Sequence, residues 1–322
     1  MDHKATIIGL GVMGQRMLNN MARYEGLMAG CAWDPDAAAC AKIAARYPDL
    51  HIAESPKAAI EDPSTRVVYI ASPPLAHREH ALAAIAAGKA VYCEKPLGVD
   101  VAESRALVEA ATSAGVVNIV NFSLASAAAT SAVERALADG ECGEVVGVDI
   151  IVHFSQWPRE WQMDAASWLS KRAEGGFTRE VLSHWIYLSE RLLGAATLRL
   201  ASAHFPPGDG AETQLVASLD ISGLPLTVMG SVGGAGPDRV EFTLWGSRAS
   251  YQIRDWNRLY RSTGHDWREA LGHIEDPREA GYELQLANAA RAVAGERHSM
   301  PDFAAALSVQ TLVEAMLADG AR

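Results

Sequence analysis

The sequence predicts an α/β protein with a doubly wound parallel sheet in its first part. A separate α+β domain with a large, mostly antiparallel open sheet is expected to follow. Short buried strands alternate with helical segments over residues 5–122, and strands separated only by turn residues occupy much of 144–253. Trp33 is the only one of the eight tryptophans in the first 150 residues, which indicates that the two parts have different cores.

In the first part, the apolar runs predict strands at 5–8, 27–33, 67–71, 90–93 and 116–122, with helices at 13–23, 36–47 and 75–87. Asp100-x-x-Glu103 resembles a capping box that opens a further helix, which Gly115 ends. Because strands that alternate with helices run parallel, we expect a parallel sheet covered on both faces.

The second part begins with a helix near 130–139, after which alternation over 144–154 predicts a strand with one apolar face. The residues on that face are Val146, Val148, Ile150, Val152 and Phe154. Further strands are expected at 198–205, 214–221, 225–232, 240–245 and 250–253, and helices at 279–293 and after Pro301. We therefore expect domains at 1–122 and 123–322, with the last helix able to pack back on the first domain.

Composition excludes several classes of function. The chain has 28 basic and 39 acidic residues, a net charge of −11, so nucleic acid and membrane surfaces are not expected partners. No apolar run reaches the roughly 18 residues of a membrane span, and the N-terminus lacks a secretory pattern. The four cysteines form no CxxC pair, so we expect neither a metal nor a disulfide scaffold, in a cytoplasmic protein.

A glycine loop, Gly9-Leu10-Gly11-Val12-Met13-Gly14, lies between the first strand and the first helix. Its three glycines suit a tight turn, close approach of a pyrophosphate, and close packing of helix on strand. Asp34 ends the second strand, where a carboxylate accepts hydrogen bonds from an adenosine ribose and repels a 2′-phosphate, which favours NAD over NADP. Asp36 is an alternative ribose partner, and a plain tight turn beside a surface aspartate is the alternative for the whole motif.

Three more segments follow in order: Ser72-Pro73-Pro74-x-x-His77, Glu94-Lys95-Pro96-Leu97 and Gly175-Gly176-x-x-x-Glu180-x-x-x-His184. With the glycine loop, they resemble the Gfo/Idh/MocA family of oxidoreductases, which includes glucose–fructose oxidoreductases and inositol dehydrogenases. The resemblance covers essentially the whole chain. It implies an N-terminal Rossmann domain that binds NAD(P), small-molecule sugar or polyol substrates, and a homodimer or homotetramer formed through the C-terminal sheet.

The resemblance also assigns residues. The expected cofactor-binding residues are Gly9, Gly11, Val12, Met13, Gly14, Asp34, Ser72, Pro73, His77, Glu94, Lys95 and Asn121. Lys95 would stabilise developing alkoxide charge, and its alternative is a solvated loop lysine. His184 would shuttle the hydroxyl proton, with Glu180 four residues earlier on the same helical face to orient it. The alternative for this pair is an exposed i,i+4 contact.

The chain departs from the family pattern at several of these places. Glu180 stands where the family most often has Asp, and Ser123 and Ser126 stand where it often has Arg and Pro. Phe177 replaces a third glycine and is expected to bring a bulky ring near the pocket. Arg179 is expected to pair with Glu180 or to reach an anionic substrate.

Tryptophans cluster around the expected active-site helix, at Trp157, Trp161, Trp168 and Trp185. We expect substrate contacts from Trp161 and Trp168, together with Lys95, Arg179, Glu180 and His184; a part in the core or an interface is the alternative for each tryptophan.

The favoured hypothesis is an NAD-dependent dehydrogenase or reductase that acts on a carbinol or carbonyl carbon of a sugar, polyol or related cyclic alcohol. Reduction of an imine or conjugated double bond is the alternative reaction on the same scaffold. A non-catalytic NAD-binding regulator is the alternative of another class, although regulators of this family tend to lose the lysine or histidine that this chain keeps.

Overall fold

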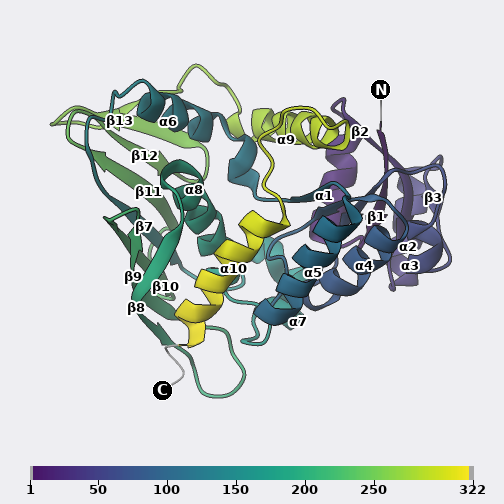
Figure 1. Cartoon of the computed structure of the whole chain (residues 1–322). Coiled ribbons are helices and arrows are strands. Elements are labelled where there is room, and N and C mark those ends of the chain that lie inside the picture. Colours follow the sequence, from purple (N-terminus) through teal and green to yellow (C-terminus); the bar gives the residue numbers. More distant parts are fainter. Residues whose placement is uncertain (1–2, 319–322) are drawn as a thin grey trace. The chain divides into compact units, whose positions relative to one another are not determined.

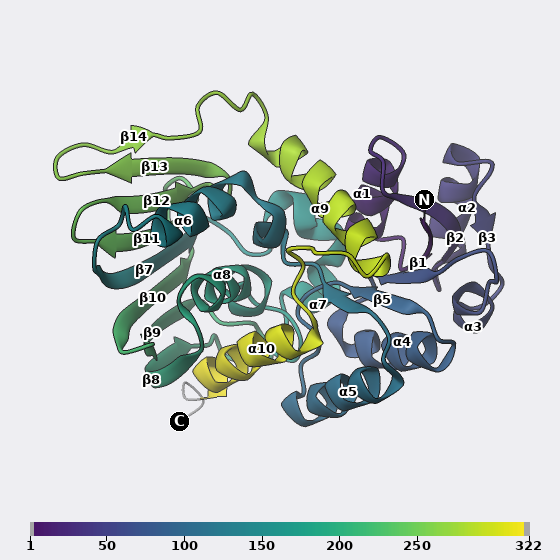
Figure 2. The same cartoon turned by 45° about the horizontal axis from the view of Figure 1, so that its top comes forward.

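A computed structural model describes residues 3–318, and the chain divides into two compact units (Figures 1 and 2). The first unit holds the residues up to Phe122 together with Tyr282–Leu307, and the second holds Ser123–Gly281 and the residues from Ser308 onward. Residues 282–307, which the sequence predicts in the second domain, thus cluster with the first. The reason is local: the Val120 N–H donates to the carbonyl of Pro301 at 2.9 Å, and the Phe303 N–H donates to Asn118 Oδ1 at 2.8 Å.

The first unit is built on a six-stranded sheet whose strands all run parallel, as predicted. The strands are β1 (His3–Ile8), β2 (Leu27–Trp33), β3 (His51–Ile52), β4 (Val67–Ile70), β5 (Ala90–Cys93) and β6 (Asn118–Val120). Their order is β3-β2-β1-β4-β5-β6. The order reverses between β1 and β4, and in such sheets ligands bind outside the carboxyl ends of the strands at that point.

Helices cover both faces of this sheet (Figure 2). They are α1 (Val12–Met21), α2 (Ala37–Arg46), α3 (Pro56–Ile60), α4 (Pro74–Ala86), α5 (Val101–Ala114) and α9 (Pro277–Val293). Asp36 caps α2, Ser55 caps α3, and the Asp100 side chain accepts from the Glu103 N–H at the start of α5. Gly115 follows α5 with a φ of +63°, a left-handed conformation that suits glycine. The helix ends that the sequence predicts from Asp100 and Gly115 are therefore confirmed.

The second unit contains an eight-stranded sheet in the order β14-β13-β12-β11-β7-β10-β9-β8. Only β7 and β10 pair in parallel, so the predicted mostly antiparallel sheet is confirmed. The strands are β7 (Val145–Phe154), β8 (Ala196–His204), β9 (Gln214–Ile221), β10 (Leu224–Val232), β11 (Arg239–Gly246), β12 (Ser250–Arg254), β13 (Arg258–Ser262) and β14 (Arg268–Glu269).

The helices of this part of the chain are α6 (Ala128–Ala138), α7 (Ala166–Leu169), α8 (Ser183–Leu193) and α10 (Phe303–Ala318). Helix α8 lies on one face of the sheet, where the Trp185 ring stacks on Phe242 of β11 with centroids 6.0 Å apart. Short 3₁₀ turns occupy Ser123–Ser126 and Glu160–Ala165, and a π-helical turn, Thr178–Leu182, leads directly into α8.

The apolar face predicted for β7 is confirmed for four residues and wrong for one. Val148, Ile150, Val152 and Phe154 are buried, but Val146 is 59% exposed. The β7–β11 register shifts between Trp245 and Gly246, at the start of β7, so the pleat there does not continue the alternation of the rest of the strand.

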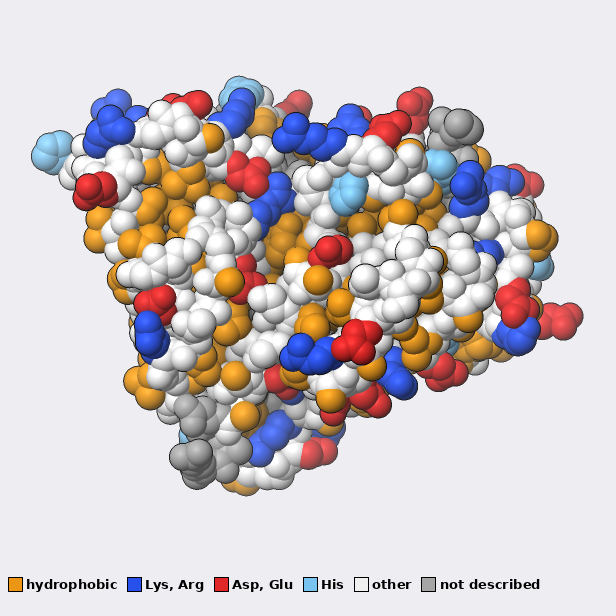
Figure 3. All heavy atoms as spheres, in the orientation of Figure 1, with side chains coloured by type: hydrophobic (Ala, Val, Ile, Leu, Met, Phe, Trp, Pro, Cys, Tyr) orange, Lys and Arg blue, Asp and Glu red, His pale blue; other side chains and the backbone are white. Residues whose placement is uncertain are grey.

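Large apolar side chains are exposed along five neighbouring strands of the second sheet. They are Val146, Leu200, Val216, Met229 and Trp245. On the face in Figure 3, acidic and basic side chains are interspersed. Among the described residues, no helix combines the length and the apolar character needed to cross a membrane.

Candidate active site

The glycine turn of the first unit has the geometry of an anion site. Gly9 has a φ of +95°, and a Cβ there would lie 2.7 Å from the carbonyl group of Ala71, while a Cβ at Gly14 would lie 1.9 Å from the oxygen of Gly9. A Cβ at Gly11 would meet nothing within 4 Å. Gly11 occupies the N-cap position of α1, where no side chain accepts a hydrogen bond from the first N–H groups of the helix. The first turn of α1 also holds no acidic residue. The N–H groups at this helix end therefore suit a pyrophosphate.

Asp34 holds this turn in place. Its Oδ2 accepts from the Leu10 N–H at 2.6 Å, and its Oδ1 accepts from the Asp36 N–H at 2.8 Å. Each carboxylate oxygen can accept a second hydrogen bond, so the half-buried Asp34 can still receive ribose hydroxyls. The carboxylate of Asp36 caps α2 by accepting from the Ala38 N–H at 2.8 Å, and Asp36 stays the alternative ribose partner.

The loop after β4 presents Ser72 and Pro73 and buries His77. The Ser72 Oγ is buried and has no hydrogen-bond partner within the described chain, as expected of a group that meets a bound cofactor. His77 is only 1% exposed, and its ring nitrogens lie 2.8 Å from the Pro96 oxygen and 2.9 Å from the Ser72 oxygen. Burial lowers the pKa of His77 to about 4. The neutral ring has one N–H, so it donates to one of these two carbonyls while lying between the loops after β4 and β5. Its predicted cofactor contact stays a prediction.

Glu94 and Asn121, at the ends of β5 and β6, form a buried polar network. Glu94 Oε1 accepts from the Asn121 amide at 2.6 Å and from the Tyr69 hydroxyl, and Asn121 Oδ1 accepts from the Tyr92 hydroxyl at 2.5 Å and from the Gln285 amide. Burial, with the Glu94 charge as the second cause, raises the pKa of both tyrosines well above the usual range. The tyrosines therefore stay protonated donors. Glu94 and Asn121, which are both predicted to contact the cofactor, thus have hydrogen-bond partners within the protein. Their contacts with the cofactor stay predictions.

Lys95 stands between these two networks. The residue before it, Glu94, is held by Tyr69 and Asn121, and the carbonyl after it, on Pro96, is held by His77. The Lys95–Pro96 peptide bond is cis, and the Lys95 side chain is half-buried. The ammonium is therefore presented from fixed backbone at the carboxyl end of a central strand, where a reacting group can be met.

In the second unit, Gly175 and Gly176 precede the π-helical turn, and close packing leaves no space for a side chain at either position. A Cβ at Gly175 would lie 2.2 Å from the Leu169 oxygen, and one at Gly176 would lie 2.2 Å from the Glu212 carboxylate. Phe177 is fully buried, and a Cβ at Gly230 of β10 would lie 2.2 Å from its ring. The expectation that Phe177 brings a bulky ring to the pocket is therefore wrong, because Gly230 leaves space for that ring in the core.

His184 lies at the start of α8 and is 5% exposed. Its Nδ1 is 3.4 Å from the Ser123 hydroxyl, so the residue that stands in place of the family's arginine touches the histidine. The Trp256 ring meets the imidazole edge to face, with centroids 5.1 Å apart and an interplanar angle of 87°. Trp256 also lies against Trp185, at 5.4 Å.

Trp256 is the residue of this site that sequence reasoning missed. It lies in the turn between β12 and β13, 72 positions after His184 in the chain, and no motif includes it. Trp256 and the preceding Asp255 have φ values of +74° and +48°. This left-handed conformation is rare for a bulky residue, and such strain is typical of functional sites. The signal available in the sequence was an aromatic residue where a turn favours glycine or asparagine.

Glu180 lies in the π-helical turn, Thr178–Leu182, rather than in the α-helix that the sequence predicts, and it is half-buried. The π turn shows in the backbone, where the Ser183 N–H donates to the Thr178 oxygen five residues earlier. Such turns occur frequently at functional sites. The pairing of Glu180 with His184 stays a prediction.

Arg179 has a structural role, and its predicted contact with Glu180 or a substrate stays a prediction. Its guanidinium is buried and forms a bidentate ion pair with Glu314 of α10, at 2.6 and 2.8 Å. It also donates to the carbonyls of Arg172 and Gly175, at 2.8 and 2.9 Å. These bonds use four of the five N–H donors of the guanidinium, so Arg179 fixes the glycine pair to α10.

We expect Arg179→Met to lower the free energy of unfolding by about 3 kcal/mol, because it leaves the partly buried Glu314 carboxylate unpaired. Urea denaturation measures the change. Arg199→Met is the matched control, because its ion pair with Asp220 lies at the surface, where solvent screens it and it contributes little to stability. Equal losses in the two variants would contradict the structural role of Arg179.

The tryptophans near this site differ in burial. Trp185 is fully buried, and Trp157 donates from Nε1 to the Leu169 oxygen at 3.2 Å and lies against Phe154. Trp185 belongs to the core, and the half-buried Trp157 packs against the core residue Phe154. Trp161 is 46% exposed, with the Arg159 guanidinium 4.8 Å from its ring centroid, and Trp168 is half-buried. Both can still contact a ligand, so their predicted part in substrate binding stays a prediction.

Similarity to known proteins extends over both units. Residues 3–122 match the model of an oxidoreductase family with an NAD-binding Rossmann fold, and residues 130–252 match the GFO/IDH/MocA C-terminal domain. A 1,5-anhydro-D-fructose reductase of Ensifer adhaerens is 38% identical over 117 residues, which is 36% of this chain and 34% of the reductase. An inositol 2-dehydrogenase of Paracoccus denitrificans is 32% identical over 161 residues, 48% of this chain and 45% of that enzyme. The matches thus span between a third and a half of these relatives.

Solved structures extend the likeness of fold to the whole chain. A levoglucosan dehydrogenase in complex with NADH and levoglucosan has a TM-score of 0.85 at 20% identity, covering 100% of this chain and 98% of that one. An NAD-binding oxidoreductase from Klebsiella pneumoniae has a TM-score of 0.83 at 22% identity, covering 99% and 96%. With both family models matched and the motifs of each unit in place, the chain belongs to the Gfo/Idh/MocA family of oxidoreductases.

Proposed function

We propose that the chain is an NAD-dependent oxidoreductase that acts on a carbinol or carbonyl carbon of a sugar, polyol or related cyclic alcohol. The observation that carries this proposal is the position of Lys95 between two residues that are held in place. The Glu94 carboxylate accepts from the Asn121 amide, and the Pro96 carbonyl lies against the His77 ring. A cation on a fixed backbone can stabilise charge that develops on a substrate oxygen without first reorganising. The curated relatives, a reductase and dehydrogenases of sugars and inositols, support the substrate class.

The roles of the residues follow from their chemistry. The glycine turn and Asp34 hold the cofactor, whose nicotinamide accepts or supplies the hydride when it is bound. Lys95 donates a hydrogen bond to the reacting oxygen. His184 takes up or returns the hydroxyl proton, because an imidazole can change protonation near neutral pH. Ser123 and Trp256 hold its ring.

A substrate panel tests this proposal. Sugars, inositols, anhydro sugars, amino sugars and cyclic imines are each assayed with NAD⁺ or NADH by the change in nicotinamide absorbance. We expect turnover with at least one polyol, sugar or anhydro sugar. Turnover confined to imines would contradict the proposal and indicate the alternative reductase. Tight NADH binding with no turnover on the whole panel would favour a non-catalytic regulator.

Cofactor preference gives a second test. We expect NADH to bind at least tenfold more tightly than NADPH, because the Asp34 carboxylate receives ribose hydroxyls and repels a 2′-phosphate. Fluorescence titration measures both dissociation constants. In Asp34→Ala the difference should shrink about tenfold, whereas Asp49→Ala, at an exposed position, should leave it unchanged. A tenfold preference of the wild type for NADPH would refute the assignment.

We further propose that the chain forms a homo-oligomer in the cytoplasm through the open face of the second sheet. Val146, Leu200, Val216, Met229 and Trp245 expose apolar side chains there, and contiguous apolar surface of this kind is typical of interfaces. The four cysteines are free thiols, which suits a reducing compartment. Analytical ultracentrifugation of Met229→Lys, compared with wild type, tests whether this face associates.

A further inference from the structure

Three side chains of the first unit converge at the edge of its parallel sheet. Cys31 of β2 and His51 of β3 are direct neighbours across the two paired strands, and Asp62 follows α3. Each supplies one possible ligand atom, and these atoms lie within 4.8 Å of one another. This is the one such group of three among residues 3–318, the part of the chain that the structure describes.

The distances resemble those of a tetrahedral metal centre. The Cys31 Sγ lies 3.6 Å from the His51 Nδ1, which lies 3.0 Å from the Asp62 Oδ2. A Zn²⁺ ion with Zn–S and Zn–N or Zn–O bonds of about 2.3 and 2.0 Å separates sulfur from nitrogen by ~3.6 Å and nitrogen from oxygen by ~3.3 Å. A bound ion therefore needs a movement of only a few tenths of an ångström.

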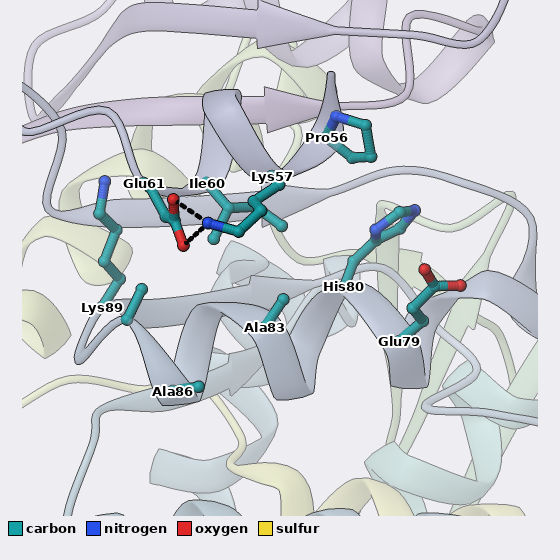
Figure 4. A pocket seen from close by; sticks show the side chains of 10 residues that line it. Pro56, Lys57, Ile60, Glu61, Glu79, His80, Ala83, Ala86 and Lys89 are labelled. Carbon is teal, nitrogen blue, oxygen red and sulfur yellow. Dashed lines mark hydrogen bonds and ion pairs between the residues drawn. The ribbon is translucent and has the colours of Figure 1, made fainter.

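The ligand set is held in place before any ion binds. The Asp62 Oδ1 accepts from the Ser64 N–H at 2.8 Å, which leaves Oδ2 directed at His51. Hydrogen bonds from Ser64, as the main cause, keep the pKa of Asp62 well below its usual range, so the carboxylate is charged. The neighbouring Glu61 is paired with Lys57, as Figure 4 shows beside the shallow pocket between α3 and α4. Asp62 is therefore the carboxylate that faces the cluster.

The same cluster is unsuited to nucleophilic catalysis. In a cysteine–histidine–aspartate relay the two ring nitrogens face different partners, but here the single Nδ1 faces both the thiol and the carboxylate. Burial, with Asp62 as the second cause, raises the pKa of Cys31 to about 12, which makes its thiol a poor nucleophile. Three ligand atoms of these types within 4.8 Å of one another are the arrangement of a metal site.

We propose that Cys31, His51 and Asp62 bind Zn²⁺ or a cation of similar softness, with a water molecule as the fourth ligand. The His51 side chain is 62% exposed, so solvent reaches the cluster from that side. On binding, the Cys31 S–H bond breaks, a Zn–S bond forms and the proton passes to the solvent. The thiolate and carboxylate then balance the two charges of the ion, so the nearby Lys89 ammonium, which donates to Thr65 Oγ1 at 2.8 Å, meets a neutral centre. The ion would tie the edge strand β3 to β2 and to the end of α3.

Calorimetric titration of the chelator-treated full chain with ZnCl₂ tests the site. We expect one equivalent to bind with a Kd below about 10 µM at pH 7.5, and cobalt to give a thiolate charge-transfer absorption band. Affinity should rise by up to tenfold per pH unit between pH 6.5 and 8, because the thiol proton must leave. His51 and Asp62 are the titratable groups that face Cys31, and Lys89 is the nearby cation.

Variants decide whether these three residues are the ligands. Cys31→Ser, His51→Ala and Asp62→Asn should each weaken Zn²⁺ binding at least tenfold, whereas His265→Ala and Cys40→Ser, which change a histidine and a thiol elsewhere, should not. His51 is largely exposed, so His51→Ala keeps the test valid even if Cys31→Ser fails to fold. Absence of Zn²⁺ binding in the wild type, or binding that all three variants retain, would overturn the proposal.

Discussion

Replacing Lys95 with alanine is expected to lower kcat at least tenfold while leaving NADH binding largely intact. In the proposed mechanism the ammonium donates to the oxygen on which charge develops, and removing such a donor costs about 10²–10³ in turnover in well-studied enzymes. The loop itself should persist in Lys95→Ala, because Glu94 and Pro96 are held by Asn121 and His77 rather than by Lys95. Steady-state kinetics gives kcat, and fluorescence titration gives the dissociation constant of NADH.

Lys42→Ala is the control for Lys95→Ala, because Lys42 lies exposed on α2 and its loss changes the net charge equally. Lys95→Met, which keeps the length of the side chain without its charge, should match Lys95→Ala in kcat. An unchanged kcat in Lys95→Ala would contradict the assignment, and a rise in KM alone would reduce Lys95 to a substrate-binding residue.

Elements with strong periodicity and a clear end were predictable from the sequence. The strands Leu27–Trp33, Ala90–Cys93 and Gln214–Ile221 have the predicted bounds, because continuous apolar runs or strict alternation define them. The two-residue strand β3 and the five-residue helix α3 were not predicted, since so few residues give no period. Strand β13 carries arginine at Arg258 and Arg261 and buries little apart from Leu259, so tertiary pairing with β12 outweighs its composition.

Within the site, local backbone requirements were predictable and long-range contacts were not. The roles of Gly9 and Gly14 follow from the strand–turn–helix pattern alone, and the structure shows the close approaches that exclude a Cβ. That Arg179 pairs with Glu314 depends on residues 135 positions apart, which no spacing rule connects. Phe177 could not be placed in the core without knowing that Gly230 lies opposite it.

The two predicted catalytic residues are held by different means in the two units. Lys95 is fixed through its backbone neighbours, whereas His184 is fixed through contacts of its own ring with Ser123 and Trp256. A lysine carries its charge at the end of a long side chain, so a fixed backbone is what determines where that charge can be placed. A histidine needs a fixed ring plane because it transfers a proton along one nitrogen.

Replacing His184 with asparagine is expected to lower kcat by about 100-fold or more, because a positioned acid–base group contributes at least that much. The NADH dissociation constant should stay within about twofold, since the cofactor residues lie on the first unit. His153→Asn is the matched control: that histidine also lies in the second unit, and its Nδ1 contacts a serine hydroxyl, on Ser231, at 2.9 Å. If both variants lose activity equally, the loss reflects damage to the unit rather than missing proton transfer.

Trp256 allows the positioning of His184 to be separated from stability. Asparagine tolerates the left-handed backbone of residue 256, so Trp256→Asn relieves about 1 kcal/mol of strain while losing ring contacts of similar size. The free energy of unfolding should therefore change by less than about 1 kcal/mol. By contrast, kcat should fall about tenfold, because the imidazole loses the ring that packs against it. Trp256→Phe keeps a ring against His184 and should recover most of the activity. A parallel fall in stability and kcat, without recovery in Trp256→Phe, would show that Trp256 only packs.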